Sequence, residues 1–430
     1  MSSLLKYLPA GIRNFAGSNA VAARYVTDGL LAASAVNIAN SNFGLFAVRL
    51  GANDYQLSLV HFLPHFFTLL VLIPGGLFMD SLQNKKHIVV VMMVVVMLGY
   101  FLCGLSPAAG LYSIQFFLGS LALAGCSVAL YNIAWQSFFP CVVDIKTRNH
   151  VLTLRTRVSL IISMIIPLLV GVLLTRIESI NGKIIMHQVF FISAVLLFFL
   201  AALNFRKFNA VRQIEPKRIS LSEITIAGKE LLRNKTFVLF TLTALFFHMT
   251  WHFDWTLYFI GQVNYLQMNE FQLGLVGVGT AGIQLLTLKF WSRKNERYGV
   301  VLPFTFGILG LSLCPVLMIV SVSLPLSSGP HIFILLNTLA HIPFCVVTLN
   351  LFQCILLVTR EENRSFYIAV FTSLLCLSNA VMPVAGVALY RSLGGDLNGF
   401  RFTFGIIFAL RIIAALLWLL WWRKNRSVRA

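Results

Sequence analysis

Residues 248–258 concentrate chemically active side chains within an otherwise apolar stretch. His248 and His252 are four residues apart and share one face of a helix, and Asp254 follows two positions later. Imidazoles can exchange protons near neutral pH, and ionisable groups are costly to keep in an apolar segment. At 100° per residue, Asp254 lies about 160° from His252 on an unbroken helix. These groups can therefore meet only if the helix breaks.

Other polar groups recur at helical spacing in apolar stretches. Asn37 and Asn40 share a face, and Asn132 and Gln136 are four residues apart. Such amides can bind a polar ligand or join two helices by hydrogen bonds. We predict that the substrate or proton site draws on these amides and on the cluster of the previous paragraph: His248, His252, Asp254, Trp251, Trp255, Asn37, Asn40, Asn132 and Gln136.

Four further charges need an explanation because they lie in or beside apolar stretches. Asp28 follows Arg24 by four residues, which predicts an ion pair within one helix, with either a structural role or a role in gating. Arg155 either extends its head group to the membrane surface or forms an anion-attracting cavity mouth. Arg411 lies deep in the last apolar stretch, so we expect a partner for it or a route to water.

The composition identifies a membrane protein. Of the 430 residues, 58% are hydrophobic and 11% are charged, whereas a soluble protein carries about 25% charged residues. The apolar runs are about 18–25 residues long, which predicts membrane-spanning helices. We expect an all-α fold with twelve spans, at 24–46, 56–79, 88–105, 111–137, 151–175, 187–205, 237–260, 271–291, 301–323, 332–357, 366–390 and 402–422.

The distribution of Lys and Arg predicts the orientation of these spans. The net charge is +19, and its basic residues lie mainly between apolar runs, which argues against nucleic acid as a partner. With the N-terminus inside, inner segments carry 24 basic residues, outer segments 5 and spans 4, which accounts for all 33. We therefore predict that both termini are cytoplasmic and that the protein is a multi-pass component of the plasma (inner) membrane.

The two halves of the chain resemble each other. Residues 53–60 (NDYQLSLV) match residues 269–276 (NEFQLGLV) at an offset of 216. The same offset relates Asp80 to Glu296 and Pro167 to Pro383. A repeated offset in equivalent positions indicates a duplicated six-helix unit. We expect two pseudo-symmetric bundles, 1–205 and 237–430, joined by a cytoplasmic linker at 206–236 that contains a short amphipathic helix starting near Ser220.

One loop resembles a family signature. Gly76-x-x-x-Asp80, followed by Lys85 and Lys86 between the second and third spans, is similar to the signature loop of the major facilitator superfamily. Residues 292–299 (SRKNERYG) look like its second copy. Ser81 and Asn84 depart from the family pattern, as do Ser292 and Glu296 in the second copy.

The resemblance implies a rocker-switch secondary transporter whose loop acids latch the cytoplasmic ends of the two halves. The residues that it assigns to gating are Gly76, Asp80, Lys85, Lys86, Glu296, Arg297, Arg148 and Arg364. The alternative is that these charges only mark membrane topology.

No motif indicates an enzyme or a cofactor. The sequence lacks a GxxxxGK[ST] phosphate loop and an HExxH pair, and its seven cysteines form no CxxC. We expect no catalysis, no cofactor and no metal.

We expect a monomeric secondary transporter that moves a small organic solute by alternating access, with a proton or another ion as the coupling partner and the lipid bilayer as its surroundings. One alternative is an exporter of amphipathic drugs or lipids, which Pro167 and Gly171 favour slightly. The other is a non-transporting receptor or scaffold on a transporter fold.

Overall fold

The chain is mainly helical over the residues that the computed structural model describes: 20–41, 43–80, 85–143, 145–208, 228–359 and 364–424. No strand occurs within these ranges. Eleven segments are long and apolar enough to cross a membrane. One of them, Lys86–Gln136, contains two antiparallel helices, so the described segments correspond to the twelve expected spans.

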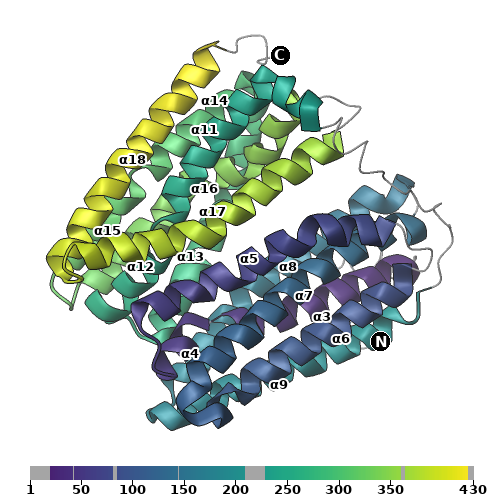
Figure 1. Cartoon of the computed structure of the whole chain (residues 1–430), viewed down its shortest axis with the longest axis horizontal. Helices are drawn as coiled ribbons and strands as arrows, with labels where there is room; N and C mark the ends of the chain where they lie inside the picture. Colours follow the sequence, from purple (N-terminus) through teal and green to yellow (C-terminus); the bar gives the residue numbers. More distant parts are fainter. Residues whose placement is uncertain are drawn as a thin grey trace. The chain divides into compact units, whose positions relative to one another are not determined.

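The first compact unit comprises Met1–Gly51 and Leu70–Arg218. Within it, α3 packs against α8 and α9, and α6 packs against α7 and α9 (Figure 1). Its helices are α3 (Ala20–Asn40), α4 (Phe43–Arg49), the second part of α5 (Asp54–Asp80), α6 (Lys85–Leu105), η1 (Ser106–Tyr112), α7 (Ser113–Val142), α8 (Ile145–Thr175) and α9 (Ile180–Phe205).

The second compact unit comprises Ala52–Leu69 and Ile219–Ala430, so it also includes the first part of α5. Asp54 in that part forms an ion pair with Arg391. The α11 helix packs against α17 and α18, and α16 packs against α13 and α14. The further helices are α11 (Lys235–His252), α12 (Trp255–Ile260), η2 (Gly261–Tyr265), α13 (Glu270–Tyr298), α14 (Val301–Leu311), α15 (Cys314–Val322), α16 (Gly329–Val358), α17 (Arg364–Ser392) and α18 (Leu397–Lys424).

The internal repeat is visible in how equivalent helices begin. Asn53 caps α5 by accepting a hydrogen bond from Gln56 N at 2.9 Å, while Asn53 N donates to Gln56 Oε1 at 3.0 Å. Asn269 and Gln272 form the same reciprocal pair at 2.9 and 3.0 Å in front of α13. Each pair satisfies backbone N–H groups that a helix start leaves free. The octapeptide match thus encodes the same local structure twice.

Several expected spans are interrupted helices. The first is α3 followed by α4, the ninth is α14 followed by α15, and the seventh is α11, α12 and a π-helical turn. In the seventh, the break lies at Phe253 and Asp254. A Cβ on Gly386 of α17 would lie 1.9 Å from Phe253 O, so glycine is required where the broken segment meets α17.

Two expectations fall where the structure gives no description. The amphipathic helix near Ser220 lies in 209–227, outside the described residues. Residues 81–84 also lie outside them, as do the side chains at positions 76–80, 85, 148 and 364. Lys86 is half-buried, and Glu296 and Arg297 are exposed at the end of α13. The latch therefore stays a prediction.

Candidate functional site

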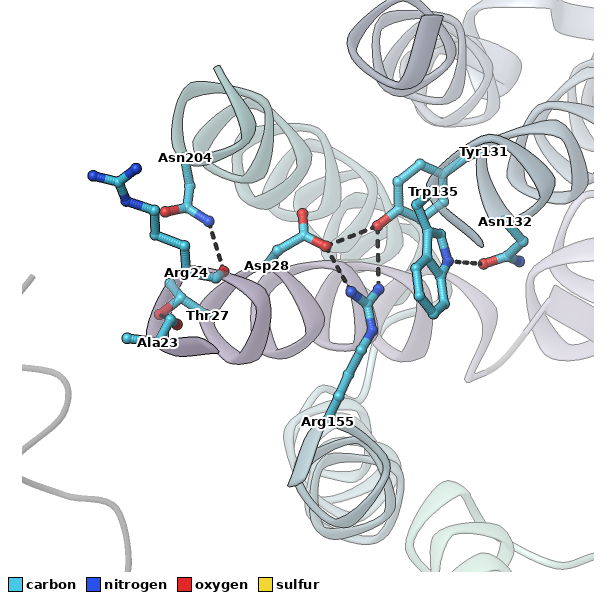
Figure 2. Close-up of polar contacts among 9 residues, drawn as sticks. All are labelled: Ala23, Arg24, Thr27, Asp28, Tyr131, Asn132, Trp135, Arg155 and Asn204. Atoms are coloured by element: carbon cyan, nitrogen blue, oxygen red, sulfur yellow. Dashed lines mark hydrogen bonds and ion pairs between the residues drawn. The ribbon is translucent and has the colours of Figure 1, made fainter. Parts of the chain in front are cut away.

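A buried ion pair joins two helices of the first unit. Arg155 of α8 donates from Nη1 to Oδ2 of Asp28 on α3 at 2.9 Å (Figure 2). Asp28 is fully buried, and Arg155 is 9% exposed. The other carboxylate oxygen, Oδ1, has no hydrogen-bond partner among the described residues. This oxygen therefore has unused hydrogen-bonding capacity among the described residues.

Two aromatic side chains of α7 complete the arrangement around the guanidinium. The Tyr131 hydroxyl donates to Asp28 Oδ2 at 3.3 Å and accepts from Arg155 Nη2 at 3.5 Å. The Arg155 guanidinium carbon lies 4.0 Å from the centre of the Trp135 ring, a cation–π contact. Trp135 Nε1 in turn donates to Asn132 Oδ1 at 3.2 Å (Figure 2).

A cavity of about 450 Å³ adjoins this pair, within the range of pockets that hold small molecules. Its walls combine polar side chains from three helices with short apolar ones. Arg155 is the charged side chain in the wall, and Trp135 is the largest aromatic. The lining residues are Gly29, Ala32, Ala33, Val36, Asn37, Val128, Tyr131, Asn132, Trp135, Arg155, Ser159, Leu160 and Ser163.

The local sequence explains how Arg155 fits beside α3. A Cβ at Gly29 would lie 2.6 Å from Arg155 Cγ, so glycine leaves room for the arginine stem. The small residues Ala32 and Ala33 continue this face. The sequence thus places an acidic residue at position 28 and, directly after it, a helix face of small side chains.

The expected amide residues are distributed differently around the cavity. Asn37 lines it and donates to Ala33 O at 2.8 Å, and Asn132, an exposed residue, also lines it. Asn40 accepts from the Tyr100 hydroxyl at 3.1 Å and is not among the lining residues. Gln136 is exposed and also lies outside the lining.

The expected Arg24–Asp28 pair is wrong. Arg24 donates to Lys207 O, and Asn204 Nδ2 donates to Arg24 O at 2.9 Å. The Asp28 carboxylate is directed toward Tyr131 of α7 and Arg155 of α8 instead (Figure 2). The expected membrane-surface position for the Arg155 head group is also wrong, because that head group is buried against Asp28. Spacing along one helix could not reveal a partner 127 residues away.

A second buried ion pair lies in the second unit, at the break in the seventh span. Arg411 Nη2 donates to Asp254 Oδ2 at 2.6 Å, and both side chains are almost fully buried. Arg411 also donates to backbone oxygens: Leu311 O at 3.1 Å, Trp251 O at 3.2 Å and Thr250 O at 3.4 Å. Two of these oxygens belong to the last turn of α11, where the break removes their helical partners.

The two histidines of this span have different surroundings. His252 Nδ1 is 2.9 Å from Ser378 Oγ. His248 is buried, and neither of its ring nitrogens has a partner among the described residues. Its ring centre lies 5.3 Å from that of His252 and 5.5 Å from that of Trp251. The break therefore does not unite His252 and Asp254, which bond to different helices.

Trp255 extends the aromatic cluster toward two further histidines. Its ring centre is 4.6 Å from His252, 6.0 Å from His61 and 6.4 Å from His65. The two last residues belong to the part of α5 that groups with the second unit. Among the described residues, no group of three or more His, Cys, Asp or Glu side chains is close enough to hold a metal ion.

Comparison with known families identifies the chain. The model of the Major Facilitator Superfamily matches residues 29–263 and again residues 251–430. The protein therefore belongs to this superfamily, and the two matches correspond to the two repeats. This confirms the predicted family and the all-helical fold of two bundles, and it indicates a multi-pass membrane transporter rather than an enzyme.

Solved structures support the same fold. The nucleoside transporter NupG superposes with a TM-score of 0.70 at 11% identity, covering 93% of this chain and 99% of its own. A bacterial homologue of the iron transporter ferroportin gives 0.68 at 13%, with 93% and 98% covered. The D-xylose-proton symporter gives 0.67 at 11%, with 93% and 96% covered. No curated protein sequence matches the chain, and identities this low indicate the fold alone.

Proposed function

We propose that this protein is a proton-coupled secondary transporter of a small polar organic solute, and that Asp28 and Arg155 couple proton binding to solute binding. One observation carries the proposal: the Arg155–Asp28 pair, at 2.9 Å, lies at a cavity of about 450 Å³ that contains Arg155 in its wall. Buried ionisable groups inside a membrane helix bundle are costly and are kept for a function.

The pair has the chemistry of a switch. While Asp28 is ionised, it neutralises Arg155, and the cavity wall carries little net charge. A proton on Oδ1 removes the negative charge and leaves the Arg155 guanidinium uncompensated in a site of low dielectric. The cation then attracts hydrogen-bond acceptors or anionic groups of a solute. Trp135 and the amides of Asn37 and Asn132 orient the solute. Loss of the proton reverses these steps and favours release.

Asp254 and Arg411 suit this role less well. Arg411 donates to one carboxylate oxygen and three backbone oxygens, so most of its donors are already used. We therefore assign that pair to holding the helix break. His248 remains a candidate proton acceptor, because both of its nitrogens are free of partners among the described residues.

We further propose cytoplasmic termini, a plasma-membrane location and a monomer. The charge bias of 24 inner to 5 outer basic residues supports the orientation. A monomer is proposed because the solute cavity lies within a single unit of one chain.

Proteoliposomes containing the purified protein test the proposal. A panel of carboxylates, sugars, nucleosides, cationic amphiphiles and ferrous iron is first screened by thermal shift and then by solute-dependent proton uptake. We expect at least one polar organic solute to drive proton movement. Asp28→Asn, which cannot bind and release the proton, should keep solute counterflow and lose accumulation driven by a pH gradient.

Asp396→Asn is the matched control. Asp396 accepts from Gly399 N at the start of α18, at 2.7 Å, and asparagine preserves such a cap. This variant should behave like the wild type. Accumulation under a pH gradient by Asp28→Asn would remove Asp28 from the mechanism.

The apolar part of the same cavity favours a second candidate, an exporter of amphipathic compounds. Ala32, Ala33, Val36, Val128 and Leu160 form this part of the wall. Stabilisation by cationic amphiphiles alone, with no response to polar solutes, would select this alternative.

A further inference from the structure

We propose that the end of α13 and the start of α14 form a binding site for an anionic phospholipid. We call it the α13–α14 groove and define it by six residues: Arg293, Lys294, Tyr298, Leu302, Pro303 and Phe306. Its two parts are a basic cavity and an apolar cavity, and Lys294 lines both. A phospholipid presents a phosphate directly beside acyl chains, which matches this pairing of surfaces.

The basic part contains four cations on one helix. Lys289, Arg293, Lys294 and Arg297 line a cavity of about 290 Å³ together with Phe290. None of the four has an acidic partner among the described residues. Lys294 Nζ lies 5.5 Å from the ring centres of both Phe290 and Tyr298. Aromatic contacts leave the positive charge uncompensated, so the cluster can attract a phosphate.

The apolar part lies alongside, between the two helices. A cavity of about 430 Å³ is lined by Trp291, Lys294, Tyr298, Leu302, Pro303 and Phe306. Phe306 is 58% exposed, and Tyr298 is 46% exposed. Trp and Tyr gather where membrane meets water, and exposed apolar side chains next to them suit acyl chains.

The groove is preformed. Asn295 and Asn350 exchange two hydrogen bonds at 2.6 and 2.8 Å, and Asn350 also donates to Val300 O at 2.8 Å. These bonds fix the turn from α13 into α14. Trp291 Nε1 donates to Ile342 O at 2.8 Å, which orients the indole. A site held in this way loses little freedom when a lipid binds.

Charge favours a lipid over the chain's own central linker as the occupant. Residues 206–235 contain eight basic residues against three acidic ones, so the linker would repel the basic cavity. The alternative is that the four cations only determine topology. A role in topology alone would not explain the adjoining apolar cavity, and it predicts equal binding of anionic and zwitterionic lipids.

Binding can be measured with the full-length protein by native mass spectrometry and by thermal shift. The probes are phosphatidylglycerol and phosphatidylcholine with the same acyl chains. We expect phosphatidylglycerol to be retained preferentially and to raise the melting temperature more. Arg293→Gln/Lys294→Gln should weaken its binding about 30-fold, since each cation near a membrane surface contributes about a factor of five.

Arg423→Gln/Lys424→Gln is the matched control, because it removes two exposed cations from the end of another span, α18. It should leave phosphatidylglycerol binding at the wild-type level. Phe306→Ser should weaken binding of the lipid by removing an acyl-chain contact. Equal losses in the two double variants, or equal stabilisation by inorganic phosphate alone, would overturn the proposal.

Discussion

Two arginines, Arg155 and Arg411, are each buried beside an aspartate, but their remaining bonds differ. Arg155 has a tyrosine hydroxyl and a tryptophan ring as its other neighbours and lies in a cavity wall. Arg411 is surrounded by backbone oxygens of the broken seventh span and of α14. The first arrangement can respond to a proton or a solute, whereas the second fixes a backbone conformation.

Neither pair has a counterpart in the other half of the chain. At the offset of 216, Asp28 corresponds to Ala244 and Arg155 to Phe371, while Asp254 corresponds to Ile38 and Arg411 to Val195. The repeat therefore preserves helices, caps and the loop acids Asp80 and Glu296, but not the buried ion pairs. Each half contains its own buried pair, which agrees with separate roles for the two.

Substitutions at Asp254 and Arg411 should differ in cost. Arg411→Met leaves a buried carboxylate and backbone oxygens without partners, and we expect a loss of about 3–5 kcal/mol in the free energy of unfolding. Asp254→Asn keeps the backbone contacts of Arg411 and should cost less. Melting temperatures of the purified variants in one detergent provide the measurement.

The double variant Asp254→Leu/Arg411→Met is the control for this comparison. Apolar replacement of both partners removes the unpaired charge, so it should be more stable than Arg411→Met alone. An equal or lower melting temperature for the double variant would show that the bonds to Thr250, Trp251 and Leu311 dominate over the ion pair.

At the scale of helices, the break in the seventh span depends on its contact with α17. Gly386→Ala would place a methyl group within 1.9 Å of Phe253 O, a backbone atom that cannot move without shifting α11 or α12. We expect a loss of about 1–3 kcal/mol from this overpacking. Gly405→Ala on α18 has no atom within 4 Å of the added Cβ and should be neutral or slightly stabilising. Equal melting temperatures for the two variants would contradict the close contact.

The helix starts at Asn53 and Asn269 allow a test of the repeat. Because the two capping boxes have the same distances, Asn53→Ala and Asn269→Ala should destabilise the protein by similar amounts, about 1 kcal/mol each. Melting temperatures of the single and double variants measure this. Additive losses are expected, because the two helix starts are separate sites. If only one of the two variants were destabilised, the two caps would not contribute equally to stability, and this prediction would be wrong.

The sequence predicted the helices better than the partners of the polar residues. Hydrophobic length located the twelve spans, and the offset of 216 predicted the duplicated unit, whose matching octapeptides form the paired caps of α5 and α13. The sequence predicts a break near Asp254 only on the condition that His252 and Asp254 act together. No Gly or Pro marks the position of the break. The pairing of Asp28 with Arg155 depends on packing between helices, which periodicity along one helix does not contain. The sequence did show that two acids, Asp28 and Asp254, and the arginines Arg155 and Arg411 lie within apolar spans. That was the available indication that these residues need partners.

For the whole molecule, the described residues support a duplicated transporter of the Major Facilitator Superfamily with unequal halves. The first unit contains the cavity with Arg155, and the second contains the histidine and tryptophan cluster. The coupling that we propose needs an ion-sensitive group and a solute site whose binding equilibria depend on each other. The first unit provides both within one cavity, which is why we place coupling there.

Membrane orientation decides where the proton and the lipid act, and it can be tested with two serines of the second unit. Ser327, between α15 and α16, and Ser292, near the end of α13, are both exposed, and the charge bias assigns them to opposite sides. In a cysteine-free background expressed in the plasma membrane of intact cells, a membrane-impermeant maleimide should label Ser327→Cys and not Ser292→Cys. Permeabilised cells should show labelling of both, which controls for reactivity. The opposite pattern would place the α13–α14 groove in the outer leaflet, and an anionic lipid of the inner leaflet could then no longer be its occupant.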